Sequence, residues 1–130
     1  MSENIHSIKV NIYYEDTDAG GVVYYANYLR YLERARMEFL KDKGVDVIDL
    51  HNKGIFFVVS HLEISYKRPA RLGDTLMVTT EVVELKNASL KIKNQILKDN
   101  ELLLEAYLTL ACIENGKLRR LPEQFKSILS

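Results

Sequence analysis

Two carboxylates and two glycines lie close together near the start of the chain. Asp16 and Asp18 are two residues apart, and Gly20 and Gly21 follow shortly after them. The chain then enters a predicted helix, whose start offers unpaired backbone N–H groups and a positive dipole end. A carboxylate held beside such groups could activate water or attack a carbonyl carbon whose oxygen they stabilise. The same residues could instead form an ordinary turn, because aspartate-rich glycine turns are common.

Metal and nucleotide sites fit this stretch less well. Asp16, Asp18 and Gly21 match three positions of a calcium-binding EF-hand loop. However, Gly20 supplies no side-chain ligand, and Asn27 stands where that loop needs a glutamate. The remaining potential ligands share no zinc-like spacing: His6, His51, His61 and Cys112. No glycine-rich nucleotide-binding motif occurs, so we expect an enzyme without a metal or cofactor.

The composition is typical of a single globular domain in a reducing compartment. With 130 residues, 47% of them hydrophobic, the chain can bury a core, and we expect one domain over residues 1–130. The 18 basic and 18 acidic side chains cancel, which gives no electrostatic case for nucleic acid or an anionic membrane. The lone Cys112 cannot form an internal disulfide, and neither an export signal nor a membrane-spanning apolar run is visible. We therefore expect a cytoplasmic protein.

The hydrophobic pattern predicts one long helix and five strands. Residues 8–12 alternate as a strand does, residues 26–43 follow a helical period, and Gly44 is a suitable helix C-cap. Four further strands are predicted over residues 55–66, 75–85, 88–97 and 102–113. Their connections are of hairpin size, which favours an antiparallel sheet. Short helices are expected over residues 45–52 and after Pro122.

These elements predict an α+β fold in which the long helix covers one face of a mostly antiparallel five-stranded sheet. The apolar stripe of the helix consists of Tyr28, Leu29, Leu32, Ala35, Phe39 and Leu40. The other sheet face has no cover within the chain. Leu103 and Tyr107 are predicted to point outward there, which indicates an oligomer contact rather than free solvent.

The carboxylate and glycine motif resembles the signature of hotdog-fold acyl-CoA thioesterases. The match runs from Tyr14 to Tyr24 as Tyr-x-Asp-Thr-Asp-Ala-Gly-Gly-Val-Val-Tyr, with an Asn-Tyr pair at the helix start. Residues 33–36 and 68–74 are similar to the Tol–Pal-associated branch, whose members are relatives of 4-hydroxybenzoyl-CoA thioesterase. The resemblance covers residues 8–122. It implies the hotdog fold, a long helix wrapped by a sheet, and subunits that pair their sheets into dimers, often dimers of dimers.

The resemblance also implies an enzyme that hydrolyses acyl-CoA to a free acid and CoA. Asp18 matches the catalytic carboxylate, which would act as a general base toward water or as a nucleophile on the thioester carbon. The backbone N–H of Tyr24 is expected to stabilise the oxyanion. Asp16 is expected to fix the turn through bonds from backbone N–H groups.

Position 25 departs from the Tol–Pal-associated branch, which usually carries histidine where this chain has Tyr25. The 4-hydroxybenzoyl-CoA branch is similar to this chain in having an aromatic residue there. A phenol with a pKa near ~10 is a poor base at pH 7. The Tyr25 hydroxyl could still bond to the thioester or to water, and the ring is expected to pack the acyl pocket.

Six residues are expected to bind the substrate: Gly21, Val22, Asn27, His61, Lys67 and Arg71. The basic residues among them would meet the phosphates of CoA. Further candidates for that role are Arg68, Arg119 and Arg120. His61 would line the acyl pocket. The plainer interpretation of any one basic residue is a solvated surface charge, and of the histidine an ordinary strand residue.

Two other functions remain open. A non-catalytic module that binds acyl thioesters or acyl carrier protein would explain the missing branch histidine, but it gains nothing from an ionised carboxylate beside the thioester. A hotdog dehydratase would need a histidine paired with an acid, and no histidine lies within the motif. We therefore expect a hydrolase that works as a homo-oligomer with sites at the subunit interface.

Overall fold

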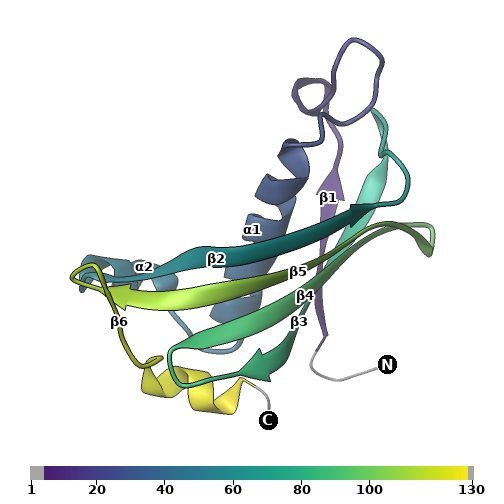
Figure 1. The fold of residues 1–130 in the computed structure, drawn as a ribbon. Coiled ribbons are helices and arrows are strands. Elements are labelled where there is room, and N and C mark those ends of the chain that lie inside the picture. The colour runs from purple at the N-terminus through teal and green to yellow at the C-terminus, as the bar shows by residue number, and fades with distance from the viewer. Residues whose placement is uncertain (1–4, 129–130) are drawn as a thin grey trace.

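The computed structural model describes residues 5–128, in which a curved sheet wraps around one long helix (Figure 1). The helices and strands are β1 (His6–Asn11), α1 (Asn27–Asp42), α2 (Val47–Asn52), β2 (Ile55–Tyr66), β3 (Thr75–Leu85), β4 (Ser89–Lys98), β5 (Glu101–Glu114) and β6 (Lys117–Leu118). Two 3-10 helices, η1 (Tyr14–Asp16) and η2 (Glu123–Ser127), complete the list. The predicted long helix, the short helix before β2 and the strand over residues 55–66 are confirmed.

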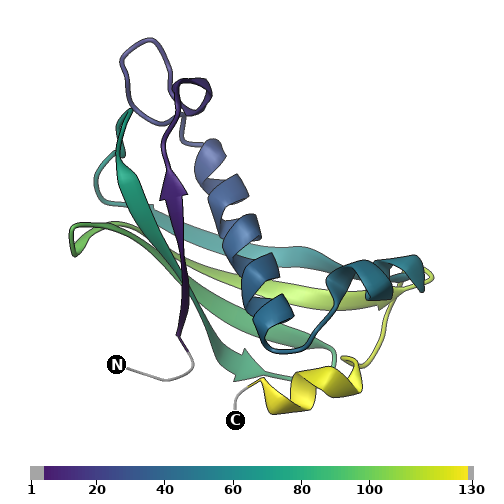
Figure 2. The ribbon, with the colours of Figure 1, turned by 180° about the vertical axis from the view of Figure 1, so that it is seen from behind.

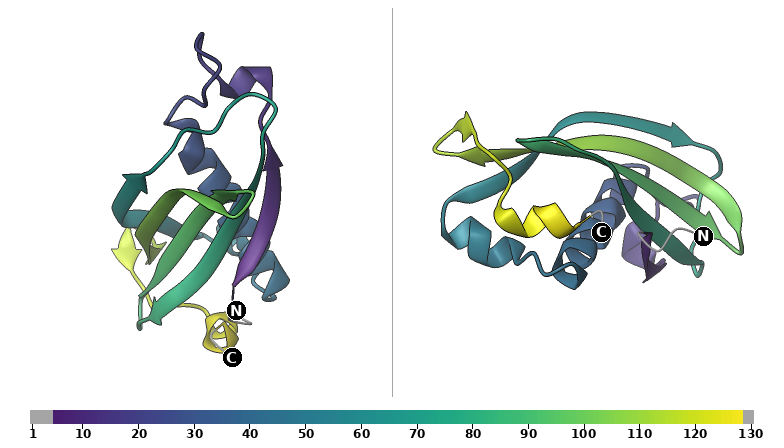
Figure 3. Two further views of the ribbon diagram at one scale, coloured as in Figure 1. Left: turned by 90° about the vertical axis from the view of Figure 1, so that its right-hand side faces the viewer. Right: turned by 90° about the horizontal axis from the view of Figure 1, so that it is seen from below.

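The sheet is antiparallel throughout, with the strand order β1-β3-β4-β5-β2 and the two-residue β6 paired to β5. It therefore has six strands where five were expected. Seen from below, the sheet arches over α1 and η2 (Figure 3). The predicted α+β arrangement of a helix on a mostly antiparallel sheet is confirmed. Within residues 5–128, no helix is both long and apolar enough to cross a membrane.

Helix α1 lies against the sheet in the view from behind (Figure 2), and its apolar stripe is buried there. The buried residues of the helix are Tyr28, Tyr31, Leu32, Ala35, Phe39 and Leu40. The prediction for Leu29 was wrong, because this side chain is 39% exposed while Tyr31 is only 1% exposed. Positions 28, 31, 35 and 39 follow the three- and four-residue spacing of one helix face, and position 29 lies at its margin.

The outward sheet face also differs from the prediction. Leu103 is buried at 2% exposure, because the pairing of β4 with β5 shifts between Ile96 and Leu97 and leaves Leu103 as the extra residue. Tyr107 does point outward. The ammonium groups of Lys91 and Lys93 lie 5.5 and 6.0 Å from its ring centroid. Two cations therefore lie beside Tyr107, the aromatic side chain that was expected to make an oligomer contact on this face.

The exposed apolar surface gathers instead on the edge strand β2. Its twelve residues pair with β5 along one side only. Large exposed side chains on it are Phe56, Val58, Val59, Leu62 and Tyr66. A long edge strand with unpaired backbone groups and an apolar surface is a template for another strand. This edge becomes important when the site is considered.

Candidate active site

The segment between β1 and α1 folds into a small hairpin that projects beyond the sheet (Figure 1). Thr17 and Val23 form an isolated antiparallel bridge, and the N–H of Asp18 donates to the carbonyl of Val22 at 2.9 Å. The N–H of Gly21 donates to the carbonyl of Asp18 at 3.0 Å. Gly21 has φ +78, which glycine adopts without steric cost. The two glycines therefore close a tight tip around Asp18.

The Asp18 carboxylate is exposed, and only one of its oxygens is held. Its Oδ1 accepts the backbone N–H of Gly20 at 2.8 Å. Within residues 5–128 its Oδ2 has no hydrogen-bond partner. A Cβ on residue 20 would lie 3.3 Å from Oδ1, so glycine at this position keeps the carboxylate uncrowded. One oriented oxygen and one free oxygen suit a base or a nucleophile.

Asp16 holds the hairpin to the start of α1, as predicted for a turn-fixing residue. Its side-chain Oδ2 accepts the N–H of Tyr13 at 2.9 Å. Its backbone carbonyl accepts two further bonds, from the N–H of Tyr24 and from Nδ2 of Asn27, both at 3.1 Å. Asn27, which was expected to bind substrate, thus uses its amide to hold the loop.

A buried phenol lies beneath this junction. Burial, and next the nearby Asp16 carboxylate, raise the pKa of Tyr31 well above its ordinary value. No hydrogen bond of ordinary geometry joins the Tyr31 hydroxyl to a partner within residues 5–128. Tyr31 is consequently a neutral packing residue at the base of the loop.

The expected oxyanion donor has another partner in this structure. The N–H of Tyr24 is taken by the Asp16 carbonyl. The first bonds of the helical turn come from the N–H groups of Asn27 and Tyr28, which donate to the carbonyls of Tyr24 and Tyr25. Among the described residues, no acceptor bonds the N–H groups of Tyr25 and Ala26. The free donors at the helix mouth therefore begin one residue later than the sequence indicated.

An aromatic pocket of about 310 Å³ opens beside the helix mouth. Its lining includes Tyr25, Tyr28, Tyr66 and Lys67. The Tyr66 ring lies 6.3 Å from the Tyr25 ring and 5.8 Å from the Tyr28 ring. The Tyr28 hydroxyl accepts the N–H of Ala70 at 2.9 Å, and burial raises the pKa of both Tyr28 and Tyr66. Tyr28 and Tyr66 are thus neutral phenols at neutral pH.

Tyr66 is the site residue that the sequence did not reveal. It ends β2 about forty residues after the motif, and no local pattern marks it. Its place beside Tyr25 follows only from where the β2 edge strand meets the start of α1.

The segment before β3 supports the hairpin from the other side. The N–H of Val23 donates to the carbonyl of Ala70 at 2.9 Å, and the N–H of Leu72 donates to the carbonyl of Gly21 at 3.0 Å. Val22 forms an isolated bridge with Arg71. Gly21, Val22 and Arg71 of the predicted set therefore lie together. Their backbones hold one another.

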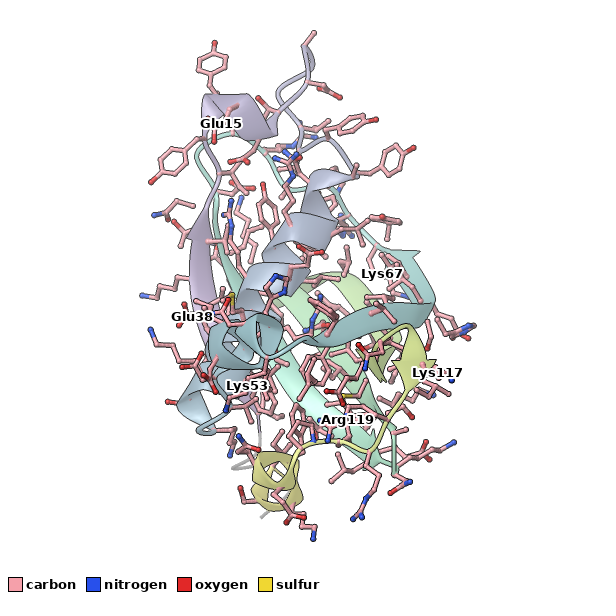
Figure 4. The ribbon with its side chains drawn as sticks, turned by 90° about the vertical axis from the view of Figure 1, so that its left-hand side faces the viewer. Glu15, Glu38, Lys53, Lys67, Lys117 and Arg119 are labelled. Atoms are coloured by element: carbon pink, nitrogen blue, oxygen red, sulfur yellow. The ribbon has the colours of Figure 1, made fainter. Side chains whose placement is uncertain are left out.

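The basic candidates separate into two groups. Within residues 5–128, the side chains of Lys67 and Arg71 form no ion pair, while Arg68 pairs with Glu101 at 2.8 Å. Arg119 pairs with Glu114 at 3.4 Å. Figure 4 shows Arg119 at the end of the molecule away from Glu15, which marks the hairpin. Arg119 and the adjacent Arg120 therefore do not reach the site of the same chain.

His61, which was expected to line the acyl pocket, lies on the exposed face of the sheet. The pairing of β2 with β5 shifts between Val59 and His61, which reverses the alternation of side chains along the strand. The His61 Nε2 lies 3.0 Å from Glu63 Oε1 on the exposed side of the sheet, and this contact lowers the pKa of Glu63. The tyrosine pocket lies on the opposite side, beside α1.

The described part of the chain contains no group of three histidine, cysteine, aspartate or glutamate residues able to hold a metal ion. Cys112 is buried in β5, as expected for a structural thiol, and burial raises its pKa. The chemistry available at the hairpin is therefore that of a carboxylate, two free N–H groups and neutral phenols.

Comparisons with known proteins agree on one family. The family model described as the thioesterase-like superfamily matches residues 13–129. The acyl-CoA thioesterase YbgC of Haemophilus influenzae is 42% identical over 120 residues, which are 92% of this chain and 88% of that protein. The crystal structure of a probable thioesterase from Bartonella henselae is 39% identical, with a TM-score of 0.82 over 91% of this chain and 98% of that one.

A third comparison concerns the fold alone. A 4-hydroxybenzoyl CoA thioesterase, solved as a variant with 4-hydroxybenzoyl CoA, is 18% identical and has a TM-score of 0.88. The match covers 98% of this chain and 99% of that one. The expected hotdog fold is thereby confirmed.

The support of the hairpin by Asp74 should give a pH-dependent stability. Burial would raise the pKa of Asp74, but the bond from Lys98 at 2.9 Å and the N–H of Arg71 outweigh it and lower the pKa. A lowered folded-state pKa stabilises the fold above about pH 4, and this contribution is lost as the pH falls. Asp74→Asn should therefore lower the free energy of unfolding most near pH 7. The difference from the parent should shrink as the pH falls from about 5 to 2.

Urea unfolding at a series of pH values measures this difference. Glu38→Gln is the control, because Glu38 is an exposed helix carboxylate that forms no ion pair within residues 5–128. Glu38→Gln should leave the pH dependence of the unfolding free energy close to that of the parent. If the unfolding free energies of the parent and Asp74→Asn differed by the same amount at every pH down to 3, the lowered pKa of Asp74 would be contradicted.

Proposed function

The chain belongs to the thioesterase-like superfamily, and from that membership and the geometry of its hairpin we propose that it hydrolyses acyl-CoA thioesters. The products are a free acid and CoA. One observation carries the proposal: an exposed carboxylate with one free oxygen belongs to the same hairpin that leads into unbonded N–H groups at a helix mouth. A thioester carbonyl needs that pair of functions, one to deliver an attacking oxygen and one to receive the oxyanion.

Asp18 is the proposed catalytic group. As a base, it takes a proton from water while the water oxygen bonds to the thioester carbon, and the carbonyl electrons move to the oxygen. The tetrahedral oxyanion then collapses, the carbon–sulfur bond breaks, and the CoA thiolate takes up a proton. As a nucleophile, Asp18 would form a mixed anhydride that water hydrolyses in a second step. Both routes need the free Asp18 oxygen, and a thiolate leaves without prior protonation.

The oxyanion donor in this proposal is the N–H of Tyr25, in place of the expected Tyr24. The Tyr24 N–H is engaged by the Asp16 carbonyl, while the Tyr25 N–H is unbonded within residues 5–128. It also lies at the start of α1, where the helix dipole favours negative charge. Loss of a single oxyanion donor typically costs an enzyme ~10²–10³ in kcat, so the identity of this donor matters.

The tyrosine pocket is the proposed place of the acyl group next to the thioester. Tyr25 and Tyr66 present ring surface there, and Tyr28 is fixed by its bond to Ala70. In this proposal the Tyr25 side chain shapes the pocket instead of replacing a histidine base. Lys67 in the pocket lining and Arg71 beside the hairpin are the proposed partners of the CoA phosphates, because neither side chain forms an ion pair within residues 5–128.

We propose that the working form is a homo-oligomer, a dimer that pairs further into a tetramer. The support is the β2 edge, whose apolar side chains and unpaired backbone suit an antiparallel match with a second copy. Tyr66 ends this strand and lines the tyrosine pocket, so pairing at β2 would bring the second copy beside each site. The lone buried thiol fits a reducing compartment, for which we propose the cytoplasm.

The alternative is a module that binds acyl thioesters or acyl carrier protein without cleaving them. A pure binding site gains nothing from an ionised carboxylate kept uncrowded by Gly20. The hydrolase therefore explains the hairpin better. Acyl carrier protein in place of CoA as the thiol carrier is a variant of the same chemistry.

The β2 edge is tested by changing its charge. Val58→Arg places a cation on the exposed edge, and light scattering should then find a mass near that of the 15.0 kDa chain, while the parent gives a multiple of it. Val83→Arg is the matched control, because Val83 is a comparably exposed valine on β3. Val83→Arg should leave the mass of the assembly at that of the parent. A parent mass near 15.0 kDa would remove the shared interface from the proposal.

Asp18→Asn tests the catalytic role. The amide keeps the size of the side chain but loses the charge and the basic oxygen, so kcat should fall by ~10²–10⁴ and KM should change little. Asp46→Ala is the control, because Asp46 caps α2 by accepting the N–H of Asp49 at 3.0 Å, and alanine removes that cap. That variant should lose up to about 1 kcal/mol of stability and keep its turnover.

Thermal melting and thiol release are to be measured on the same preparations of both variants. If Asp18 were only a turn residue, its variant would turn over normally whatever its melting temperature, as the Asp46 variant should. More than a third of the parent rate in a folded Asp18→Asn protein would end the proposed mechanism.

A further inference from the structure

A buried hydroxyl lies beneath the junction of the hairpin with α1 and takes no part in the proposed mechanism. It belongs to Tyr31, whose side chain is 1% exposed. The ring packs edge-on against Tyr28, and the Arg34 guanidinium lies 5.8 Å from its centroid. The hydroxyl oxygen is buried and forms no hydrogen bond of ordinary geometry within residues 5–128. A hydroxyl withdrawn from water without a partner destabilises a fold, so this group needs an explanation.

The Asp16 carboxylate is the acceptor available to this hydroxyl. Burial, and next the Asp16 carboxylate, raise the pKa of Tyr31, so the two groups are neighbours. Asp16 is partly buried, and its Oδ2 accepts the N–H of Tyr13 at 2.9 Å. Its Oδ1 has no hydrogen-bond partner within residues 5–128. The last torsion of an aspartate is soft, so its carboxylate can turn to accept from a neighbouring hydroxyl.

The spacing along α1 supports the same partner. Asn27 and Tyr31 are four residues apart, so their side chains lie one above the other on one face of the helix. The Asn27 amide donates to the backbone carbonyl of Asp16 at 3.1 Å. A bond from the Tyr31 hydroxyl to the Asp16 carboxylate would hold the same residue at a second point. Two attachments, one to its backbone and one to its side chain, fix the orientation of Asp16 more closely than one.

We propose that the Tyr31 hydroxyl donates to the Asp16 carboxylate and is a positioning group for the hairpin. Asp16 precedes Asp18 by two residues, and its carbonyl engages the N–H of Tyr24. The contact therefore sets where the Asp18 carboxylate lies relative to the free N–H of Tyr25. Tyr31 is too deeply buried to touch a thioester, so it acts only through Asp16. The effect on turnover rests on the proposed function, whereas the contact and its effect on the hairpin do not.

A double-mutant cycle in urea unfolding tests the contact, with Tyr31→Phe and Asp16→Ala as its two changes. Tyr31→Phe keeps the buried ring and removes only the hydroxyl. It should lower the midpoint of unfolding in the parent. In Asp16→Ala it should leave the midpoint unchanged or raise it, because the acceptor is already gone. Tyr107→Phe is the matched control, since it removes a hydroxyl from the outward sheet face, and it should unfold as the parent does.

Two further measurements test the positioning role. The Tyr24 N–H should exchange with deuterium about tenfold faster in Tyr31→Phe than in the parent, because the junction opens more often. On the acyl-CoA that the parent cleaves fastest, kcat should fall about tenfold with KM little changed, since a small misplacement of the carboxylate slows chemistry more than binding. Tyr107→Phe should match the parent in both measurements.

An unchanged or raised unfolding midpoint in Tyr31→Phe would overturn the proposal, because it would mean that the hydroxyl has no partner. An equal loss in both backgrounds would also overturn it, by assigning the bond to another acceptor. Parent rates of Tyr24 exchange or of thiol release in Tyr31→Phe would exclude the positioning role. If the parent itself released no thiol, the proposed function would fail, while the unfolding cycle and the exchange rate would still decide this inference.

Discussion

A single backbone carbonyl holds the candidate site together. The carbonyl of Asp16 accepts the N–H of Tyr24 and the side-chain amide of Asn27, both at 3.1 Å, and so ties the hairpin to the start of α1. Because this carbonyl occupies the Tyr24 donor, the unbonded donors begin at Tyr25. The same contact fixes the hairpin that carries Asp18. The position of the Asp18 carboxylate relative to the start of α1 therefore depends on this one junction. Backbone hydrogen bonds from the segment before β3 also support it.

The fold explains why such a junction is stable although it projects from the sheet. The apolar face of α1 fills the hollow of the sheet and fixes the direction of the helix start. Tyr28 lies on that face in the first turn of α1. Its hydroxyl accepts the N–H of Ala70, and its ring packs beside Tyr66. The core thus ends in the tyrosine pocket, so the side chains that pack the helix start also line the pocket proposed for the acyl group.

The sequence predicted what periodicity and turn chemistry encode. Strand β2, helix α1 and the turn-fixing role of Asp16 were all readable, because alternation, helical spacing and Asp-Gly turns are local signals. The prediction for Leu103 was wrong because an extra residue in β5 reverses the alternation, and a second extra residue, in β2, turns His61 to the exposed face. Such bulges leave no mark in composition. The partner of the Tyr24 N–H is a backbone atom, and the contact of Tyr66 with Tyr25 joins distant segments, so neither had a local signal.

The central claim is that this hairpin cleaves a thioester instead of only holding one. Free-thiol release by the unaltered protein from acetyl-, octanoyl- and palmitoyl-CoA tests it most directly. The account predicts many turnovers per chain on at least one of the three substrates, with thiol and free acid formed in equal amounts. Saturable binding of these thioesters with no thiol released above the buffer rate would contradict it and identify a binding module.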